Sequence, residues 1–144
     1  MKILVINGPN LNLLGIRERS IYGERSYEDL KNAISDFCAS RKVDIEIFQS
    51  NSEGELIDKI HSSRDANGIV INAGAYTHTS IAMRDALSGV GIPFIEVHIS
   101  NVYKREPFRH KSMLSDIAVG VIAGFGFNSY LYAIDFLITK NSSI

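Results

Sequence analysis

A tyrosine and an arginine stand out in the long connection that follows the first apolar run of the chain. Tyr22 comes five residues after Arg17, and Gly15 and Gly23 enclose the segment. Glycine tolerates backbone conformations that other residues avoid, so these two can act as hinges. Tyrosine is ordinarily neutral, and the positive charge of a nearby guanidinium favours its phenolate form. Arg17 and Tyr22 can therefore supply a base from a mobile segment.

A second set of chemical groups lies in the sequence Glu96-Val97-His98-Ile99-Ser100-Asn101. Because side chains alternate between the two faces of a strand, Glu96, His98 and Ser100 are expected on one face. A carboxylate beside an imidazole can orient the ring and favour its protonated form. The pattern predicts a general acid at His98, held by Glu96. The alternative is an ordinary half-exposed strand end with no chemical role.

A third candidate segment runs from Asn72 to Ser80 and includes His78. The amide of Asn72 and the imidazole of His78 can hydrogen-bond a polyhydroxylated ligand. Asp85 follows His78 by seven residues, or about two helical turns, so it is expected to line the same wall. The alternative is a capped helix with a solvated Asp85.

Two arginines, Arg105 and Arg109, follow these segments at a spacing of four residues. Guanidinium groups bind carboxylates and hydroxyls. These two can clamp a ligand or only pair with acidic neighbours, and the sequence alone leaves both interpretations open.

Hydrophobic periodicity predicts the elements that must position these groups. Short apolar runs typical of buried parallel strands alternate with stretches of helical spacing. The expected strands are 2–7, 43–49, 68–72, 94–99 and 117–123, and the expected helices are 26–40, 52–64, 80–88 and 128–139. A connection of about eighteen residues separates the first strand from the first helix, whereas such connections usually take about 2–6 residues. The excess length indicates that this connection has a function.

The alternation predicts a single α/β domain over residues 1–144. We expect a three-layer, flavodoxin-like sandwich with a five-stranded parallel sheet in the strand order 2-1-3-4-5. In such folds, ligands bind beyond the carboxyl ends of the strands, where the strand order reverses. The polar residues expected at that edge are Asn7, Asn10, Asn72, His98, Ser100 and Asn101. The candidate groups should therefore meet in one crevice.

Composition narrows the class of protein. The chain has 144 residues, of which 45% are hydrophobic and 22% charged, as in globular domains. The net charge of −1 gives no electrostatic footprint for nucleic acid or a membrane surface. No apolar run reaches the ~20 residues that a membrane span requires. Neither a nucleic acid nor a membrane is expected as a partner.

The cysteine content and the first residues favour a cytoplasmic location. Cys38 is the single cysteine, so a disulfide within the chain is impossible. Its place on an apolar helix face predicts a buried thiol. The chain opens on a strand pattern rather than on a secretory signal sequence. A cytoplasmic protein is therefore expected.

Several familiar chemistries are not indicated. The histidines at positions 61, 78, 98 and 110 show no metal-ligand spacing such as H-E-x-x-H. No Walker A motif follows a strand, and Gly8-Pro9-Asn10 is not a dinucleotide fingerprint. A G-x-S-x-G nucleophile elbow is also missing. The sequence thus predicts no metal site.

Five motifs occur in one order along the chain: Gly8–Gly15, Arg17 with Tyr22, Gln49–Gly54, Ala75–Ser80, and Glu96–Asn101 with its arginine-rich sequel. Together they resemble the type II 3-dehydroquinate dehydratase family over essentially the whole chain. Two positions depart from the family pattern, since Arg19 and Ala73 stand where relatives usually or often have proline. Both departures are expected to change loop stiffness without removing a functional group.

The resemblance implies a reversible anti elimination of water from 3-dehydroquinate, through an enolate, to give 3-dehydroshikimate. In this implied scheme Tyr22, assisted by Arg17, removes the proton from C2. His98, oriented by Glu96, donates a proton to the departing C1 hydroxyl. Asn10 holds a water molecule that hydrogen-bonds the enolate oxygen. The pathway implied is the shikimate pathway of aromatic amino-acid biosynthesis.

The same resemblance implies how the substrate is bound. The backbone N–H groups of Ile99 and Ser100, with the Ser100 hydroxyl, bind its carboxylate. The ring hydroxyls are contacted by Asn72, His78, Asp85 and Arg109. The connection that carries Arg17 and Tyr22 closes over the substrate and excludes water. No cofactor or metal is implied, and the implied assembly is a homododecamer built as a tetramer of trimers.

A non-catalytic flavodoxin-like module that binds a small anion or a flavin is the competing interpretation. A phosphoacceptor receiver needs aspartate where this chain has Asn7 and Asn72. A flavin carrier needs aromatic residues around the isoalloxazine ring, and its yellow colour would identify it.

Overall fold

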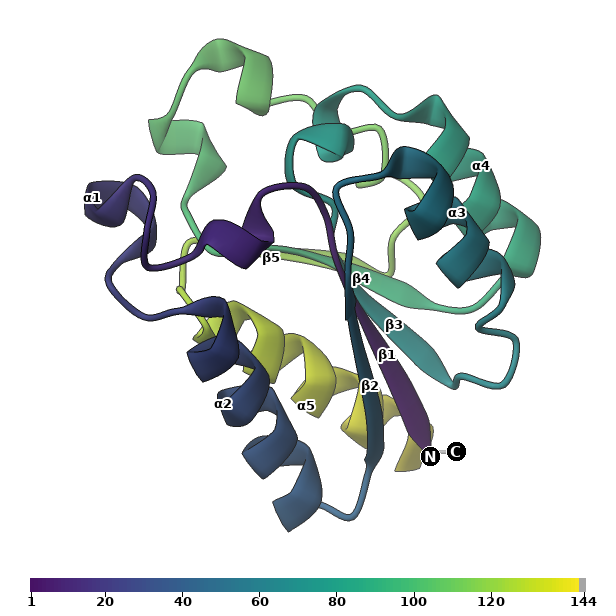
Figure 1. Ribbon diagram of the computed structural model, residues 1–144. Coiled ribbons are helices and arrows are strands. Elements are labelled where there is room, and N and C mark those ends of the chain that lie inside the picture. The colour runs from purple at the N-terminus through teal and green to yellow at the C-terminus, as the bar shows by residue number, and fades with distance from the viewer. Residues whose placement is uncertain (143–144) are drawn as a thin grey trace.

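The computed structural model describes residues 1–142 and contains a five-stranded parallel sheet (Figure 1). The strands are β1 (Lys2–Asn7), β2 (Asp44–Gln49), β3 (Gly68–Asn72), β4 (Phe94–His98) and β5 (Gly120–Ala123). Their spatial order is β2-β1-β3-β4-β5, and every neighbouring pair is parallel. The predicted fold class and strand order are confirmed.

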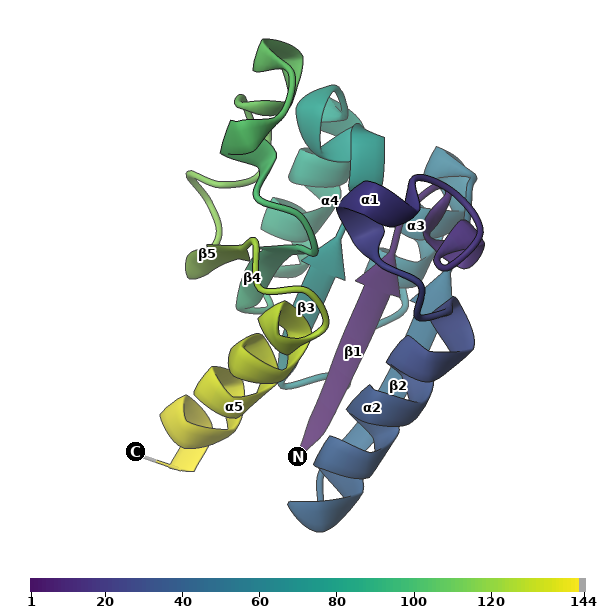
Figure 2. The same cartoon turned by 90° about the vertical axis from the view of Figure 1, so that its left-hand side faces the viewer.

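Helices cover both faces of the sheet (Figures 1 and 2). The main helices are α2 (Tyr27–Ser40), α3 (Glu53–His61), α4 (Ile81–Val90) and α5 (Asn128–Ser142). Ile3 and Val5 of β1 pack with α2 and α5 on one face. The residues that alternate with them, Leu4 and Ile6, pack with α3 and α4 on the other. Burial on both faces explains why the strands are continuous apolar runs.

Side-chain caps fix where the helices begin. The Ser26 hydroxyl accepts a hydrogen bond from the Asp29 N–H, and the Asp29 carboxylate accepts one from the Ser26 N–H. This reciprocal pair satisfies two backbone donors that the first turn of α2 would otherwise leave unpaired. Ser52 and Ser80 cap α3 and α4 in the same way, by accepting from a backbone N–H three residues on. Among residues 1–142, no helix is long and apolar enough to cross a membrane.

The long connection after β1 contains helical structure. Leu11–Leu13 forms a 3-10 turn, and α1 (Arg19–Tyr22) is a single helical turn. The Arg19 side chain donates from Nε to the carbonyl of Gly15 at 3.0 Å, which ties the start of α1 to the preceding turn. Arg19 is the first residue of α1, a position where proline is also well tolerated. The departure from the family pattern at this position therefore creates no backbone conflict.

Three elements differ from the prediction by three residues at one end, and α3, which ends at His61 rather than at residue 64, is the first of them. β5 begins at Gly120 rather than at residue 117, because the N–H groups of Ile117 and Ala118 both donate to the carbonyl of Leu114 and close a turn. α5 continues to Ser142, three residues beyond the predicted end. The predicted bounds of these elements were wrong, although their types were right.

The single cysteine lies in the core, as predicted. Cys38 of α2 is 0% exposed and packs in the layer between α2, α5 and the sheet. Burial raises the pKa of its thiol, and the nearby Arg41 only partly opposes this effect. Cys38 therefore behaves as a small apolar side chain rather than as a reactive thiolate.

Candidate active site

A cavity of about 130 Å³ opens beyond the carboxyl ends of β1, β3 and β4. It is lined by Pro9, Asn10, Leu11, Arg17, Tyr22, Asn72, Gly74, Ala75, His78, His98, Ile99, Ser100, Val102, Arg105 and Arg109. The crevice forms here because β1 connects to β2 on one side and the chain returns to β3 on the other, so the strand order reverses. Most of the predicted site residues are thus brought together.

Four residues predicted for this crevice do not line the cavity: Asn7, Asn101, Glu96 and Asp85. Asn7 is fully buried at the end of β1, where it accepts from Tyr130, and the Asn101 side chain accepts from the Tyr103 N–H. Glu96 lies behind His98, on the face of β4 that is covered by the segment after residue 111. Asp85 lies on α4 and is exposed to solvent. Its predicted position assumed helical spacing from His78, but His78 belongs to the 3-10 turn Gly74–His78 that precedes α4. A seven-residue step across that junction does not keep two side chains on one wall.

His98 and Glu96 form a buried pair. His98 Nε2 lies 2.6 Å from Glu96 Oε2, and the two residues are 6% and 2% exposed. The other carboxylate oxygen, Oε1, accepts hydrogen bonds from the hydroxyls of Ser112 at 2.7 Å and Ser115 at 2.8 Å. Burial would raise the pKa of Glu96, but the hydrogen bonds from His98, Ser112 and Ser115 outweigh it, so the pKa is lowered. Glu96 is therefore an ionised partner for the imidazole.

The hydrogen bonds fix which nitrogen of each histidine is available to a ligand. Because a carboxylate only accepts, His98 Nε2 carries the proton in its bond to Glu96, which leaves Nδ1 for the cavity. His78 Nδ1 lies 2.8 Å from the carbonyl of Lys111 and must donate to it, which leaves its Nε2. The two rings are stacked, with centroids 6.3 Å apart and planes 15° apart. Both imidazoles are thus held in defined orientations.

The contacts of Glu96 lead to a prediction about acid stability. Replacing Glu96 by glutamine should lower the free energy of unfolding at pH 7 by about 1–3 kcal/mol, because a charged hydrogen-bonded group is lost from a buried network. A lowered carboxylate pKa contributes stability above the ordinary value of 4.5, and that contribution is lost as the pH falls through the folded-state value. The difference between the two proteins should therefore shrink below pH 4.5. Urea unfolding at pH 7 and pH 3.5 measures it, and equal differences at both values would contradict the prediction.

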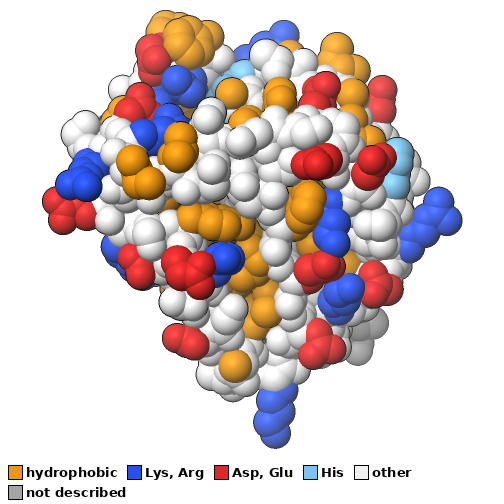
Figure 3. Space-filling view, in the orientation of Figure 1, with side chains coloured by type: hydrophobic (Ala, Val, Ile, Leu, Met, Phe, Trp, Pro, Cys, Tyr) orange, Lys and Arg blue, Asp and Glu red, His pale blue; other side chains and the backbone are white. Residues whose placement is uncertain are grey.

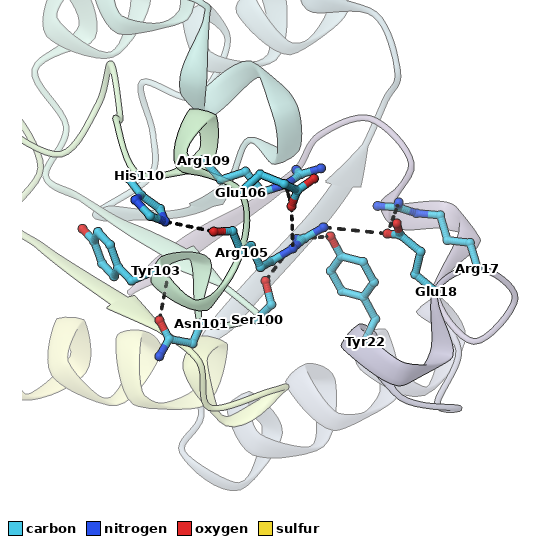
Figure 4. Close-up of polar contacts among 10 residues, drawn as sticks. All are labelled: Arg17, Glu18, Tyr22, Ser100, Asn101, Tyr103, Arg105, Glu106, Arg109 and His110. Atoms are coloured by element: carbon cyan, nitrogen blue, oxygen red, sulfur yellow. Dashed lines mark hydrogen bonds and ion pairs between the residues drawn. The ribbon is translucent and has the colours of Figure 1, made fainter.

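Tyr22 reaches the cavity from α1, and a guanidinium contacts its hydroxyl directly (Figure 4). Arg105 donates from Nη1 to the Tyr22 oxygen at 2.7 Å and to the Ser100 hydroxyl at 3.3 Å. The Arg17 guanidinium lies against the ring, 4.8 Å from its centroid. Two positive charges therefore flank one phenol, and the one in hydrogen-bond contact belongs to Arg105.

Acidic side chains hold these arginines in place (Figure 4). Glu18 accepts from Arg17 at 2.8 Å and lies 3.9 Å from Arg105, so it joins the connection after β1 to the loop after β4. Glu106 pairs with Arg109 at 3.0 Å and lies 3.8 Å from Arg105. The hydrogen bond from Arg109 is the largest contribution to a lowered pKa of Glu106. We define residues 15–23, which carry Arg17, Glu18 and Tyr22, as the lid segment.

Asn72 is held in the cavity wall by buried hydrogen bonds. Its Nδ2 donates to the hydroxyl oxygen of Tyr130 at 2.9 Å, and its Oδ1 accepts from the Gly74 N–H at 3.1 Å. The Tyr130 hydroxyl in turn donates to Asn7 Oδ1 at 2.6 Å. Burial raises the pKa of Tyr130, so it stays a neutral donor and acceptor. These hydrogen bonds, which run through Tyr130 of α5, fix the orientation of the Asn72 side chain in the cavity wall.

Sequence patterns assign no definite role to four of these residues. The sequence leaves Arg105 open between a ligand clamp and surface pairing, and its spacing of four residues from Arg109 is the signal it offers. Ser112, Ser115 and Tyr130 carried no signal, because serine is common in loops and a tyrosine at helical spacing predicts only core packing. Each of them acts through a contact that only the folded chain creates.

The parallel sheet and its polar cavity define an α/β domain with a buried, hydrogen-bonded histidine–glutamate pair at the carboxyl edge of the strands. Residues 1–138 match the family model described as dehydroquinase class II. The 3-dehydroquinate dehydratase of Prochlorococcus marinus (strain NATL1A) is 56% identical over 140 residues, covering 96% of this chain and 97% of that protein. The chain belongs to the class II dehydroquinase family.

Other relatives agree with this assignment. The 3-dehydroquinate dehydratase of a Nitratiruptor species is 60% identical over 131 residues, which cover 90% of this chain and 84% of that protein. The crystal structure of type II dehydroquinase from Butyrivibrio crossotus DSM 2876 superposes with a TM-score of 0.94 at 56% identity. That match covers 95% of this chain and 97% of the other. The similarity thus extends over both the sheet and the loops that form the cavity.

Proposed function

We propose that the chain, acting as one domain, dehydrates 3-dehydroquinate to 3-dehydroshikimate in this cavity by anti elimination through an enolate. Family membership makes the protein a 3-dehydroquinate dehydratase, a hydro-lyase of the shikimate pathway. The observation that carries the proposed mechanism is the arrangement of Tyr22 and the His98–Glu96 pair around one cavity. A base and an acid on different elements suit the removal of a proton and a hydroxyl from neighbouring carbons.

In this proposal Tyr22 is the base. As phenolate it removes the C2 proton of the substrate, with the guanidinium of Arg17 against its ring and that of Arg105 at its oxygen. The same two charges lie near the negative charge that develops on the enolate. Since Arg105 comes from the loop after β4, the base is complete only when the lid segment lies against that loop.

His98 is the acid in the second half of the reaction. Its Nδ1 is the ring nitrogen available to the cavity, and Glu96 accepts from Nε2 at 2.6 Å and orients the ring. Donation of a proton to the C1 hydroxyl lets it depart as water, while the enolate electrons form the new C=C bond. Ser112 and Ser115 support the charge of Glu96 throughout.

The remaining cavity residues are proposed to bind the substrate. In this proposal Ile99 and Ser100 bind the carboxylate, and Asn72, His78 and Arg109 bind the ring hydroxyls; all five residues line the cavity. Asn10 is proposed to hold the water that hydrogen-bonds the enolate oxygen. A contact from Asp85 also stays a prediction, although the cavity of this chain does not include it. These groups orient the substrate between Tyr22 and His98.

An absorbance assay tests the proposed activity. Adding 3-dehydroquinate to purified protein should produce the ultraviolet absorbance of the conjugated enone in 3-dehydroshikimate. No increase in absorbance at micromolar protein would contradict the activity. A yellow preparation without turnover would favour a flavin-binding module instead.

The proposed lid closure predicts a change in proteolysis. A saturating concentration of 3-dehydroshikimate should slow trypsin cleavage after Arg17 and Arg19, because ligand contacts hold the lid segment against the cavity. Cleavage after Arg64, which is exposed in the turn after α3, serves as the control and should not change. Equal cleavage rates with and without ligand at all three sites would mean that the lid segment does not close over the site.

We also propose that the chain assembles as a homododecamer, built as a tetramer of trimers. β2 is an edge strand whose apolar residues Ile45, Ile47 and Phe48 are only partly covered. Figure 3 shows the face of the molecule that carries α2 and β2. Hydrophobic side chains lie along the middle of that face, between charged groups. Exposed edge strands and apolar patches of this kind commonly pair with another chain.

Mass in solution tests the assembly. Sedimentation at micromolar protein should give twelve times the 16.0 kDa mass of one chain. A species of 16.0 kDa under these conditions would contradict it.

A cytoplasmic location is also proposed. Cys38 is a free, fully buried thiol, which suits a compartment that keeps cysteines reduced. Cell fractionation with an antibody against the chain tests this location, and recovery in a secreted fraction would contradict it.

A further inference from the structure

We propose that Asn51 is a positioning residue, which holds Asn10 in the cavity by accepting a hydrogen bond from the Asn10 backbone. This inference rests on the role proposed above for Asn10. It concerns the segment Gln49–Gly54 after β2, a motif to which the proposed mechanism assigns no role. Figure 1 shows that β2 lies beside β1, so the segments that follow these two strands leave the sheet at the same edge.

Asn10 has an unusual backbone conformation. Its φ and ψ angles are 70° and −3°, in the left-handed region that residues other than glycine rarely adopt. Asparagine tolerates this region better than most residues, but the conformation still needs support from its surroundings. Two backbone contacts supply it. The Asn10 carbonyl accepts from the Leu13 N–H at 3.0 Å, and the Asn10 N–H donates to Asn51 Oδ1 at 3.0 Å.

The contacts of Gln49 fix which atom of the Asn51 amide faces Asn10. Gln49 Nε2 donates to the Gly8 carbonyl and to Asn51 Oδ1, both at 3.2 Å. Asn51 Oδ1 therefore meets two donors, the Gln49 amide and the Asn10 N–H. Only an oxygen can accept from both. The carbonyl oxygen of the Asn51 side chain is thus the functional atom, and its amino group is not required for these contacts.

Two further hydrogen bonds keep Asn51 itself in place. The Ser50 N–H donates to the Asn7 carbonyl at 3.1 Å, which continues the pairing of β2 with β1 past the last residue of each strand. The Tyr76 hydroxyl donates to the Asn51 backbone carbonyl at 3.0 Å from the segment after β3. Hydrogen bonds to the end of β1 and to the segment after β3 therefore hold this part of the chain in place. The contact between Asn51 and Asn10 then fixes the position of Asn10.

The position of Asn10 matters most in the transition state. The negative charge on the enolate oxygen develops during the reaction, so a water held by Asn10 contributes more to turnover than to substrate binding. Without the acceptor at position 51, the backbone of Asn10 is free to leave the left-handed conformation and carry its side chain away from the cavity. The loss should consequently appear in kcat rather than in KM.

Two variants of Asn51 with matched size separate positioning from other roles. Asn51→Asp keeps an oxygen acceptor for both donors, whereas Asn51→Leu keeps the approximate volume and removes it. We expect Asn51→Leu to lower kcat about tenfold, the scale of one hydrogen bond, with KM nearly unchanged. Asn51→Asp should restore kcat to near the wild-type value. Equal kcat in Asn51→Leu and wild type, or an equally low kcat in both variants, would overturn the proposal.

An Asn10→Ala variant distinguishes failure of this inference from failure of the proposed role of Asn10. If Asn10→Ala lowers kcat and Asn51→Leu does not, Asn10 acts as proposed but does not depend on Asn51. If neither variant lowers kcat while 3-dehydroquinate is still converted, Asn10 has no part in turnover, and the inference falls with it. Thermal unfolding of all variants supplies the stability control. If Asn51→Leu and Asn51→Asp both lose kcat and show the same drop in Tm, the role of Asn51 is structural, which contradicts positioning.

Discussion

Replacing Tyr22 by phenylalanine is expected to lower kcat by a factor on the order of 10²–10⁴, the usual scale for a general acid–base group. The substitution removes the hydroxyl that accepts from Arg105 and keeps the ring against which Arg17 packs. Substrate affinity should be largely kept, because the groups proposed to bind the carboxylate and the ring hydroxyls are untouched. Steady-state kinetics with 3-dehydroquinate measure both quantities.

The same substitution at Tyr103 is the control. Tyr103 is 67% exposed and lies outside the cavity, so Tyr103→Phe should turn over like the wild type. Turnover by Tyr22→Phe at a near wild-type rate would show that another group removes the proton. The proposed support of Tyr22 by Arg17 and Arg105 would then fall as well, because it depends on Tyr22 as the base.

Replacing His98 by glutamine should also lower kcat by a factor on the order of 10²–10⁴, since the general acid is lost. Glutamine is chosen because its amide can still donate to the buried Glu96 carboxylate, which limits damage to the fold. It cannot deliver a proton to the departing hydroxyl. Kinetics across pH measure the effect, with folding followed by thermal unfolding.

His61→Gln is the matched control for that variant. His61 lies at the end of α3 and is exposed, and it does not line the cavity. Its replacement should leave kcat unchanged. A His98→Gln protein that is folded and retains most of its kcat would show that the hydroxyl leaves without help from this imidazole.

The arrangement of strands and helices could be predicted because local patterns carry it. Continuous apolar runs such as Ile3–Ile6 imply strands buried on both faces, and helices between them imply parallel pairing. The end of a strand could also be located well enough to place Asn72 and His98 at one edge. The connection that carries Arg17 and Tyr22 could be singled out because it is too long to be a simple linker.

The contacts that complete the site could not be predicted, because they join residues far apart in the sequence. Arg105 bonds Tyr22 across 83 positions, and Tyr130 bonds Asn7 across 123. Nothing local distinguishes these residues from an ordinary surface arginine and an ordinary core tyrosine. The position of Asp85 relative to His78 could not be predicted for a local reason. Regular helical spacing puts the two side chains on one wall, but the chain forms a 3-10 turn at the junction before α4.

The stereochemistry of proton removal tests the mechanism most directly. Two samples of 3-dehydroquinate are needed, each with deuterium at one of the two positions on C2, and the product is examined by NMR. With Tyr22 of α1 as base and His98 of β4 as acid, both lining the cavity from different elements, deuterium should be lost only from the position anti to the C1 hydroxyl. Loss of deuterium from the syn position, with retention at the anti position, would contradict the proposed arrangement of acid and base.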